Sequence, residues 1–413
     1  MNTNLRNDAE RIIRAAIKAV SPAEAVKRAL RTKRYKGRVI LVAVGKAAWE
    51  MAQAVVESLP QEIACGAVIT KYHHVLEPIE GVTCMEAGHP VPDENSFLAT
   101  AKVLEITNDL LPTDTVLFLL SGGGSALFEQ PLVEPEELQD ITEQLLRCGA
   151  DIVEINTIRK RLSAVKGGRF AKWCEPAKLE AIILSDIVGN PLDMIASGPA
   201  VADLSTFEDA VAIVKKYNLK LSEKAWGCLY KETPKQIDNV NTQIIGSVGE
   251  LCNEAAKNCL ELGYEPVILT DCLSCEAKDA GVFLANIAKT HIAKYKKLAF
   301  IAGGETVVHV TGNGLGGRNQ ELALAAAREL AGISNVAVIS VGSDGTDGPT
   351  DAAGGYVDGD TYDRIKAEGL NYDEIMENHD AYHGLLASEG LIITGPTGTN
   401  VNDVAIALLG KMG

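Results

Sequence analysis

Short runs of valine and isoleucine alternate with helical stretches along most of this chain, and this alternation constrains its fold most strongly. In the first half the runs are Val39–Val44, Ala67–Thr70, Val116–Leu120 and Ala181–Leu184. Short apolar runs that end in glycine or polar residues are typical of strands buried on both faces. Strands that alternate with helices predict an α/β fold with a mainly parallel sheet and helices on both of its sides.

The alternation resumes beyond a polar segment at residues 230–242, which contains Pro234 and is our candidate linker. The later apolar runs are Gln243–Ile245, Pro266–Leu269, Leu298–Ile301, Val307–Thr311, Val336–Val341 and Leu391–Thr394. Polar and apolar residues alternate over 306–311, so we expect one wet face and antiparallel pairing there. Because 413 residues exceed one ordinary core, we expect two domains. Residues 1–235 would form the domain with the parallel sheet, and residues 240–413 an α/β domain with a mixed sheet.

The formal net charge of −16 argues against nucleic acid and anionic membranes as partners, because both attract basic surfaces. No apolar run approaches the ~20 residues of a membrane span, and residues 1–36 lack the apolar core of a signal peptide. The nine cysteines are an odd number and are scattered, which favours reduced thiols and a cytoplasmic location. An acidic protein that binds anions must concentrate its cations locally.

Gly45 and Lys46 follow the first predicted strand, where a parallel sheet binds its ligands. Glycine lets the backbone approach a ligand, and lysine supplies a point charge for phosphate or carboxylate. The segment is not a Walker A motif, because Ile40 stands at the first glycine position and Ala47 replaces serine or threonine. The alternative interpretation of Lys46 is an ordinary surface lysine.

A three-glycine turn follows the strand at Val116–Leu120 and precedes a predicted helix. It consists of Ser121, Gly122, Gly123, Gly124 and Ser125. Such a turn points several backbone N–H groups in one direction and thereby binds anions. A merely flexible turn is the alternative.

Residues 156–169 hold five cations within eleven positions, which an anionic ligand would explain. Arg159 and Lys166 are our candidates for binding it, and the polar face of a helix is the alternative. Asp186 follows the strand at Ala181–Leu184, where a carboxylate is placed to hold Mg²⁺ or to accept a proton. An N-cap of a helix would explain Asp186 equally simply.

Four loops rich in glycine, aspartate, asparagine and threonine follow strands in the second half, at residues 303–306, 312–321, 343–351 and 395–403. Acidic residues beside glycine and an arginine suit a Mg²⁺–phosphate site. The candidate ligand-binding residues in these loops are Glu305, Arg318, Asn319, Asp347 and Asp351, and Asp344 is a candidate metal ligand.

One of these loops also matches the G-x-G-x-x-G pattern of dinucleotide-binding folds, through Gly312, Gly314 and Gly317. Asp344 would then be the ribose-binding acid. Two observations weigh against this interpretation. The preceding predicted strand has one solvent-exposed face, whereas the first strand of a dinucleotide-binding fold is usually buried. Asp344 also lies 27 residues beyond Gly317, a little farther than the usual spacing of about 20.

With these loops in view, the chain resembles the glycerate 2-kinases of the MOFRL family, which are sometimes labelled hydroxypyruvate reductases. The resemblance covers nearly the whole chain. Its motifs are LVAVGKAA (41–48), AGHPVPDENS (87–96), LLSGGGSAL (119–127), NTIRKRLSAVKGGR (156–169), LSDIVGNPLDMIASGPA (184–200), AGGETVVHVTGNGLGGRNQEL (302–322), VGSDGTDGPTDAAGG (341–355) and TGPTGTNVND (394–403).

The resemblance implies an active site in the cleft between a Rossmann-like domain and a smaller mixed-sheet domain. It implies ATP, Mg²⁺ or another divalent cation, D-glycerate as acceptor and 2-phosphoglycerate as product. By matching motifs, the functional lysine falls on Lys46, an acidic residue on Asp186 and an arginine on Arg318.

Phosphoryl transfer depends on positioning and charge neutralisation, which agrees with the residues in these loops. We expect Lys46 and Arg318 to neutralise the transferring group and the glycerate carboxylate, and Asp186 to act as general base or metal ligand. An NAD(P)-dependent hydroxypyruvate reductase is the main alternative, and a non-catalytic protein that binds small anions is a third. Assembly with further copies of the chain is left open.

Overall fold

The computed structural model describes residues 3–185, 191–292 and 296–411, which divide into two compact units. The N-terminal unit contains residues 25–185 and 191–245, and the C-terminal unit contains residues 3–24 and 246–411. Helix α2 (Pro22–Leu30) crosses the first boundary between them.

A six-stranded sheet with the order β3-β2-β1-β4-β5-β6 forms the centre of the N-terminal unit. The strands are β1 (Val39–Val44), β2 (Ile63–Lys71), β3 (Val82–Ala87), β4 (Thr115–Leu120), β5 (Lys178–Leu184) and β6 (Val240–Gly246). Strands β3, β2, β1, β4 and β5 pair in parallel, and every residue of β1 and β4 is buried. The predicted Rossmann-like sheet is therefore confirmed.

The strand order reverses between β1 and β4. The chain proceeds from β1 through β2 and β3 toward one edge of the sheet, and from β4 through β5 and β6 toward the other edge. In doubly wound sheets the crevice at this reversal is where ligands bind, at the carboxyl ends of the strands. The loops that follow β1 and β4 contain Lys46 and Ser121–Ser125. The topology therefore brings the loop of Gly45 and Lys46 and the three-glycine turn to the same edge of the sheet.

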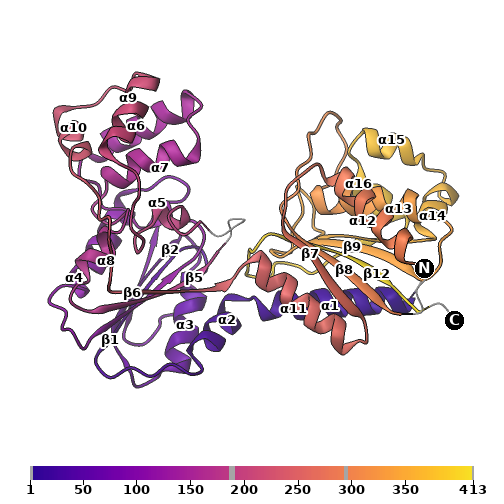
Figure 1. The fold of residues 1–413 in the computed structure, drawn as a ribbon, viewed down its shortest axis with the longest axis horizontal. Helices are drawn as coiled ribbons and strands as arrows, with labels where there is room; N and C mark the ends of the chain where they lie inside the picture. Colours follow the sequence, from indigo (N-terminus) through magenta and orange to yellow (C-terminus); the bar gives the residue numbers. More distant parts are fainter. Residues whose placement is uncertain (1–2, 186–190, 293–295, 412–413) are drawn as a thin grey trace. The chain divides into compact units, whose positions relative to one another are not determined.

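Helices cover the sheet and also build a separate cluster in this unit (Figure 1). The sheet carries α3 (Ala48–Ser58), α4 (Glu94–Ile106), α5 (Gly124–Leu127), α8 (Arg169–Trp173) and the 3₁₀ turn η1 (Ile195–Ser197). The cluster contains α6 (Pro135–Arg147), α7 (Ile152–Arg161), α9 (Phe207–Tyr217) and α10 (Glu223–Leu229), which share their own apolar core.

The C-terminal unit contains a second six-stranded sheet, with the order β11-β10-β9-β12-β8-β7. The strands are β7 (Glu265–Leu273), β8 (Leu298–Gly304), β9 (Val336–Gly342), β10 (Gly354–Asp358), β11 (Leu391–Ile392) and β12 (Asp403–Leu409). Only β7 and β8 pair in parallel, whereas the other four pairings of this sheet are antiparallel. The predicted mixed sheet is confirmed.

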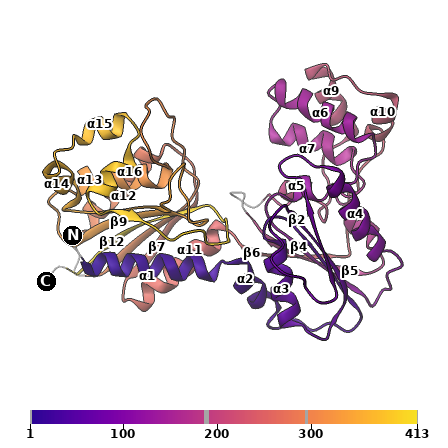
Figure 2. The same ribbon diagram turned by 180° about the vertical axis from the view of Figure 1, so that it is seen from behind.

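Both faces of the second sheet are covered by helices, as Figures 1 and 2 show. Helices α1 (Thr3–Ala19) and α11 (Val248–Glu261) lie on one face. The other face carries α12 (Ala277–His291), α13 (Arg318–Leu330), α14 (Thr361–Ala367), α15 (Tyr372–Glu377) and α16 (Ala381–Ala387). No helix among the described residues is long and apolar enough to span a membrane.

One predicted strand is wrong. Residues 307–311 form no strand, and only Val307 pairs, in an isolated bridge with Glu276. The antiparallel neighbour of β8 is instead β12, which lies between β8 and β9 and is buried throughout. An alternating pattern reports that one side of a segment is exposed, but it does not report a hydrogen-bonding partner.

The candidate linker is also wrong, because residues 230–242 pack within the N-terminal unit. Thr233 is buried and its hydroxyl donates to Asp203 at 2.8 Å, and Val240 begins β6. The expected boundaries at 1–235 and 240–413 differ from the compact units at the start of the chain as well. Helix α1 belongs to the C-terminal unit because its apolar face packs on α11 and the second sheet.

Candidate active site

The loops after β1 and β4 are joined by close backbone contacts. Lys46 N donates to Gly122 O at 2.8 Å, and Ala47 N donates to Ser121 Oγ at 3.1 Å. Gly45 has a φ of +124°, and a Cβ atom there would lie 2.2 Å from Ser121 Oγ. Only glycine therefore fits between the two loops, and its presence sets the position of Lys46 against the three-glycine turn.

Replacing Gly45 with alanine is expected to lower the free energy of unfolding by about 3 kcal/mol, from backbone strain plus overpacking. Thermal or urea denaturation measures this. Gly149→Ala is the matched control, because Gly149 also has a positive φ (+71°) but has no atom within 4 Å of the added methyl group. Equal losses in the two variants would show that the contact between the loops does not matter.

The three-glycine turn presents unused backbone donors. No described residue accepts a hydrogen bond from the N–H groups of residues 122–125. Lys46 is exposed beside the turn. Four N–H groups next to an ammonium group form a site that favours a phosphate or a carboxylate.

Two of the predicted anion-binding cations support this turn through its carbonyl groups. Arg159 Nη2 donates to Ser125 O at 3.1 Å, and Lys166 Nζ donates to Ser125 O and to Phe128 O, both at 2.8 Å. Lys166 is fully buried and lies 3.4 Å from Glu129, and its burial lowers its pKa to about 8. We therefore revise the expectation for Lys166: it holds the turn in place and does not face a ligand.

His89 is a site residue that the sequence reasoning missed. A Cβ atom at Gly123 would lie 3.1 Å from His89 Nε2 and 3.4 Å from Lys46 Cγ, so both side chains flank the turn. His89 follows β3, which ends at Ala87. The rule that ligands lie beyond the carboxyl ends of parallel strands would have found it, had β3 been predicted. Asp186, our candidate base or metal ligand, lies outside the described residues.

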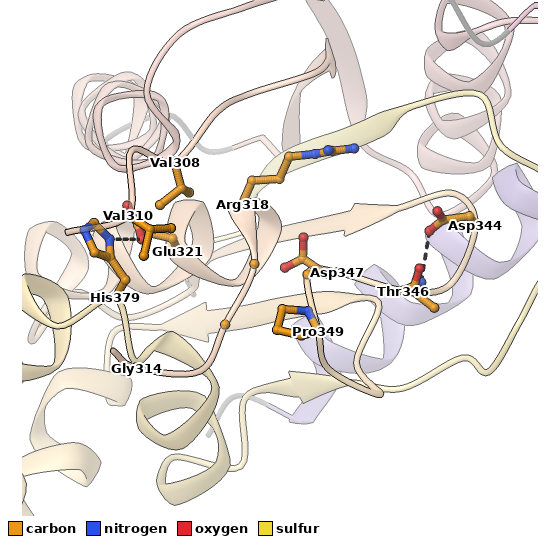
Figure 3. Close-up of a pocket in the computed structure, with 13 residues that line it drawn as sticks. Val308, Val310, Gly314, Arg318, Glu321, Asp344, Thr346, Asp347, Pro349 and His379 are labelled. Carbon is orange, nitrogen blue, oxygen red and sulfur yellow. Dashed lines mark hydrogen bonds and ion pairs between the residues drawn. The ribbon is translucent and has the colours of Figure 1, made fainter. Parts of the chain in front are cut away.

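In the C-terminal unit a pocket of about 420 Å³ opens between the loops that precede α13 and follow β9 (Figure 3). Arg318, the first residue of α13, lines it. The guanidinium binds Asp403 through Nε at 2.5 Å and Nη2 at 3.0 Å, and Nη1 lies 3.0 Å from Glu305. Burial opposes the charge, but the hydrogen bonds and charge of Asp403 outweigh it and raise the pKa of Arg318.

Asp347 occupies the N-terminus of α13. Its carboxylate accepts hydrogen bonds from Asn319 N at 3.1 Å and Gln320 N at 2.8 Å. Burial raises the pKa of Asp347 to about 6, against these hydrogen bonds. A carboxylate already fills the position that a dinucleotide-binding helix reserves for pyrophosphate.

The glycines before α13 serve packing. A Cβ atom at Gly312 or Gly314 would lie 2.5 Å from the backbone oxygen of Asn378. No strand leads directly into them, since β8 ends at Gly304 and residues 307–311 form no strand. The G-x-G-x-x-G match thus lacks both the strand and the open helix end that dinucleotide binding requires.

The other predicted residues of this unit have local partners. Asn319 is buried, and its side chain contacts Asp347 and accepts from Ser340 Oγ at 2.6 Å, so it does not face the pocket. Asp351 is exposed and accepts from Tyr382 Oη at 2.9 Å. Asp344 lines the pocket, and its Oδ1 accepts from Thr346 N at 3.0 Å, as the dashed line in Figure 3 shows.

The carboxylates that line this pocket determine whether it could hold a divalent cation. The part of the chain that the structure describes holds no group of three or more histidine, cysteine, aspartate or glutamate side chains that could bind a metal ion. Mg²⁺ often uses only one or two carboxylates and takes its other ligands from phosphate and water. Asp344 fits that mode, whereas the carboxylate of Asp347 is committed to α13.

A Rossmann-like sheet that has, at its point of reversal, a turn of N–H groups without a described acceptor is typical of enzymes that act on small anionic substrates. Residues 8–229 match the model described as a domain of unknown function (DUF4147), and residues 298–403 match the MOFRL family. The D-glycerate 2-kinase of Thermotoga maritima is 53% identical over 412 residues, covering 98% of this chain and 99% of that protein.

The chain is also similar to a second named protein and to a crystal structure. A protein of Agrobacterium vitis named putative hydroxypyruvate reductase is 38% identical over 420 residues, covering 99% of this chain and 95% of that protein. The crystal structure of a glycerate kinase from Thermotoga maritima is 51% identical, with a TM-score of 0.94 over 98% of this chain and 100% of that chain. The chain belongs to the MOFRL family, together with these glycerate kinases.

Proposed function

We propose that this protein is a glycerate 2-kinase, which transfers the γ-phosphoryl group of ATP to the 2-hydroxyl group of D-glycerate. The products are ADP and 2-phosphoglycerate. The similarity to D-glycerate 2-kinase over almost the full length of both chains supports the activity. The observation that carries the proposal in the structure is the turn at residues 122–125, whose N–H groups have no described acceptor and lie beside Lys46.

Each residue then has a role that its surroundings allow. The turn binds an anionic group of the substrates, and the Lys46 ammonium neutralises charge on the transferring phosphoryl group. Arg318 binds a second anionic group, held in orientation by its bidentate contact with Asp403. Asp186 accepts the hydroxyl proton or holds the metal, as we expected from its place after β5. Asp344 would hold Mg²⁺, which neutralises nucleotide phosphates when bound.

The reductase alternative is disfavoured by the N-terminus of α13. A dinucleotide needs free N–H groups at that position, but Asp347 accepts from two of them. We also propose a cytoplasmic location, which the nine unpaired cysteines support.

Purified protein is expected to release ADP from ATP only when D-glycerate and Mg²⁺ or Mn²⁺ are both present, and EDTA should abolish the reaction. A coupled ADP assay measures this. The parallel assay supplies NADH or NADPH with hydroxypyruvate and follows the loss of absorbance of the reduced nicotinamide. Oxidation of the nicotinamide with no ADP release in the first assay would overturn the proposal.

A further inference from the structure

A second pocket lies within the N-terminal unit, between α7 and the segment at residues 192–205. Its volume is about 600 Å³, inside the range of roughly 300–1,000 Å³ for small-molecule sites. Its lining includes Val153, Asn156, Lys160, Asp193, Asp203 and Leu204. None of the roles proposed above uses it.

The charges of the residues that line this pocket disfavour an anionic ligand. Lys160 Nζ lies 3.3 Å from Asp193 and 3.4 Å from Asp203, and the lysine side chain is only 5% exposed. One ammonium group between two carboxylates gives a net charge of −1, so a phosphate or a glycerate carboxylate would be repelled. A neutral group with hydroxyl or amino donors is favoured, because Asp193 is 48% exposed and accepts hydrogen bonds.

The rim of the pocket is apolar and open to solvent. Leu204 is 84% exposed and Val153 is 55% exposed. Large apolar side chains that are exposed around a concavity are typical of walls that a ring covers. The apolar rim therefore complements the acceptor-rich interior, whose carboxylates favour a neutral ligand with hydrogen-bond donors.

A short chain of hydrogen bonds connects this pocket to the three-glycine turn. Asn156 lines the pocket, and its Oδ1 accepts from Ser197 Oγ at 2.9 Å. Ser197 Oγ lies 3.1 Å from the Oγ atom of Ser125, which is the last residue of the turn. A ligand that has a neutral ring at one end and an anionic chain at the other could occupy both places.

We propose that this pocket binds the nucleoside portion of ATP, with the phosphate chain directed to the turn at Ser121–Ser125. The inference rests on the proposed kinase function, which requires an ATP site. It assigns the ring and ribose to α7 and residues 192–205, and only the phosphates to the glycine turn.

The test compares the binding of ATP with that of inorganic tripolyphosphate by isothermal titration calorimetry. Val153→Asn/Leu204→Asn is expected to weaken ATP binding about tenfold, because two apolar contacts are lost, and to leave tripolyphosphate binding unchanged. The KM for ATP should rise while the KM for D-glycerate stays the same. Leu111→Asn/Leu146→Asn is the matched control, because these leucines are 55% and 62% exposed and do not line the pocket.

Normal ATP binding by the pocket variant would overturn the inference, and so would equal losses for ATP and tripolyphosphate. The failure of the proposed function gives a different result. If the pocket variant shows the expected loss of ATP binding but the wild-type protein releases no ADP with D-glycerate, the pocket assignment stands and the glycerate kinase proposal fails. If ADP is released and the pocket variant binds ATP normally, only the pocket assignment fails.

Discussion

Lys46→Ala is expected to lower kcat by roughly 10²-fold or more, because the ammonium would neutralise charge that develops on the transferring phosphoryl group. The fold should be unaffected. Lys46 is exposed, and the contact that joins its loop to Gly122 uses the backbone N–H, which alanine retains. Steady-state kinetics and the thermal midpoint Tm, measured on the same preparation, separate the two effects.

Lys102→Ala is the control for Lys46. Lys102 is a partly exposed lysine on α4 of the same unit, and its ammonium forms an ion pair only with Glu105 on its own helix among the described residues. Its loss should change neither kcat nor Tm measurably, since exposed pairs of this kind contribute little. If Lys46→Ala retained the kcat of this control, Lys46 would be an ordinary surface lysine.

The second large effect concerns Lys46 and Arg318 together. If both act on one phosphoryl transfer, Lys46→Ala/Arg318→Ala should cost little more in kcat than the worse single variant, because residues that act as a unit are strongly non-additive. Arg318→Lys should not restore activity, since lysine lacks the planar fork that binds two oxygens. Fully additive losses would mean that the two residues serve separate sites.

The structure adds a requirement to that experiment. Arg318→Ala leaves Asp403 without its bidentate partner, and the Asp403 side chain is only 9% exposed. We expect this to lower the free energy of unfolding by about 2 kcal/mol. Arg318→Ala/Asp403→Asn should recover most of the lost stability but no activity. Recovery of activity in that variant would show that Arg318 acts only by neutralising Asp403.

The central strands could be predicted from the sequence because burial on both faces demands continuous apolar runs. Strands β1 and β4 are the clearest cases. Strand β3 was missed because it lies at the sheet edge and is only partly buried, so its sequence VTCMEA is not a continuous apolar run. Strand β12 was missed because its alanine- and leucine-rich run DVAIALL does not distinguish a buried strand from a buried helix.

The candidate site also contains residues that the sequence reveals and residues whose roles depend on tertiary contacts. Lys46 and the three-glycine turn were identified because both follow strands that the sequence reveals. The role of Lys166 was not accessible, since the sequence cannot tell a lysine that faces a ligand from one that donates to Ser125 O. The commitment of Asp347 to the N-terminus of α13 is likewise a tertiary contact between residues 27 or more positions apart.

The most direct test of the account is a ³¹P NMR spectrum of the products that form from ATP, Mg²⁺ and D-glycerate. Transfer to the 2-hydroxyl group places phosphorus next to one methine proton, so the proton-coupled resonance of the new phosphomonoester should be a doublet. The signals of ADP should grow at the same rate. A triplet from a neighbouring methylene group would show transfer to the 3-hydroxyl group, and the absence of any new phosphomonoester would contradict the kinase assignment itself.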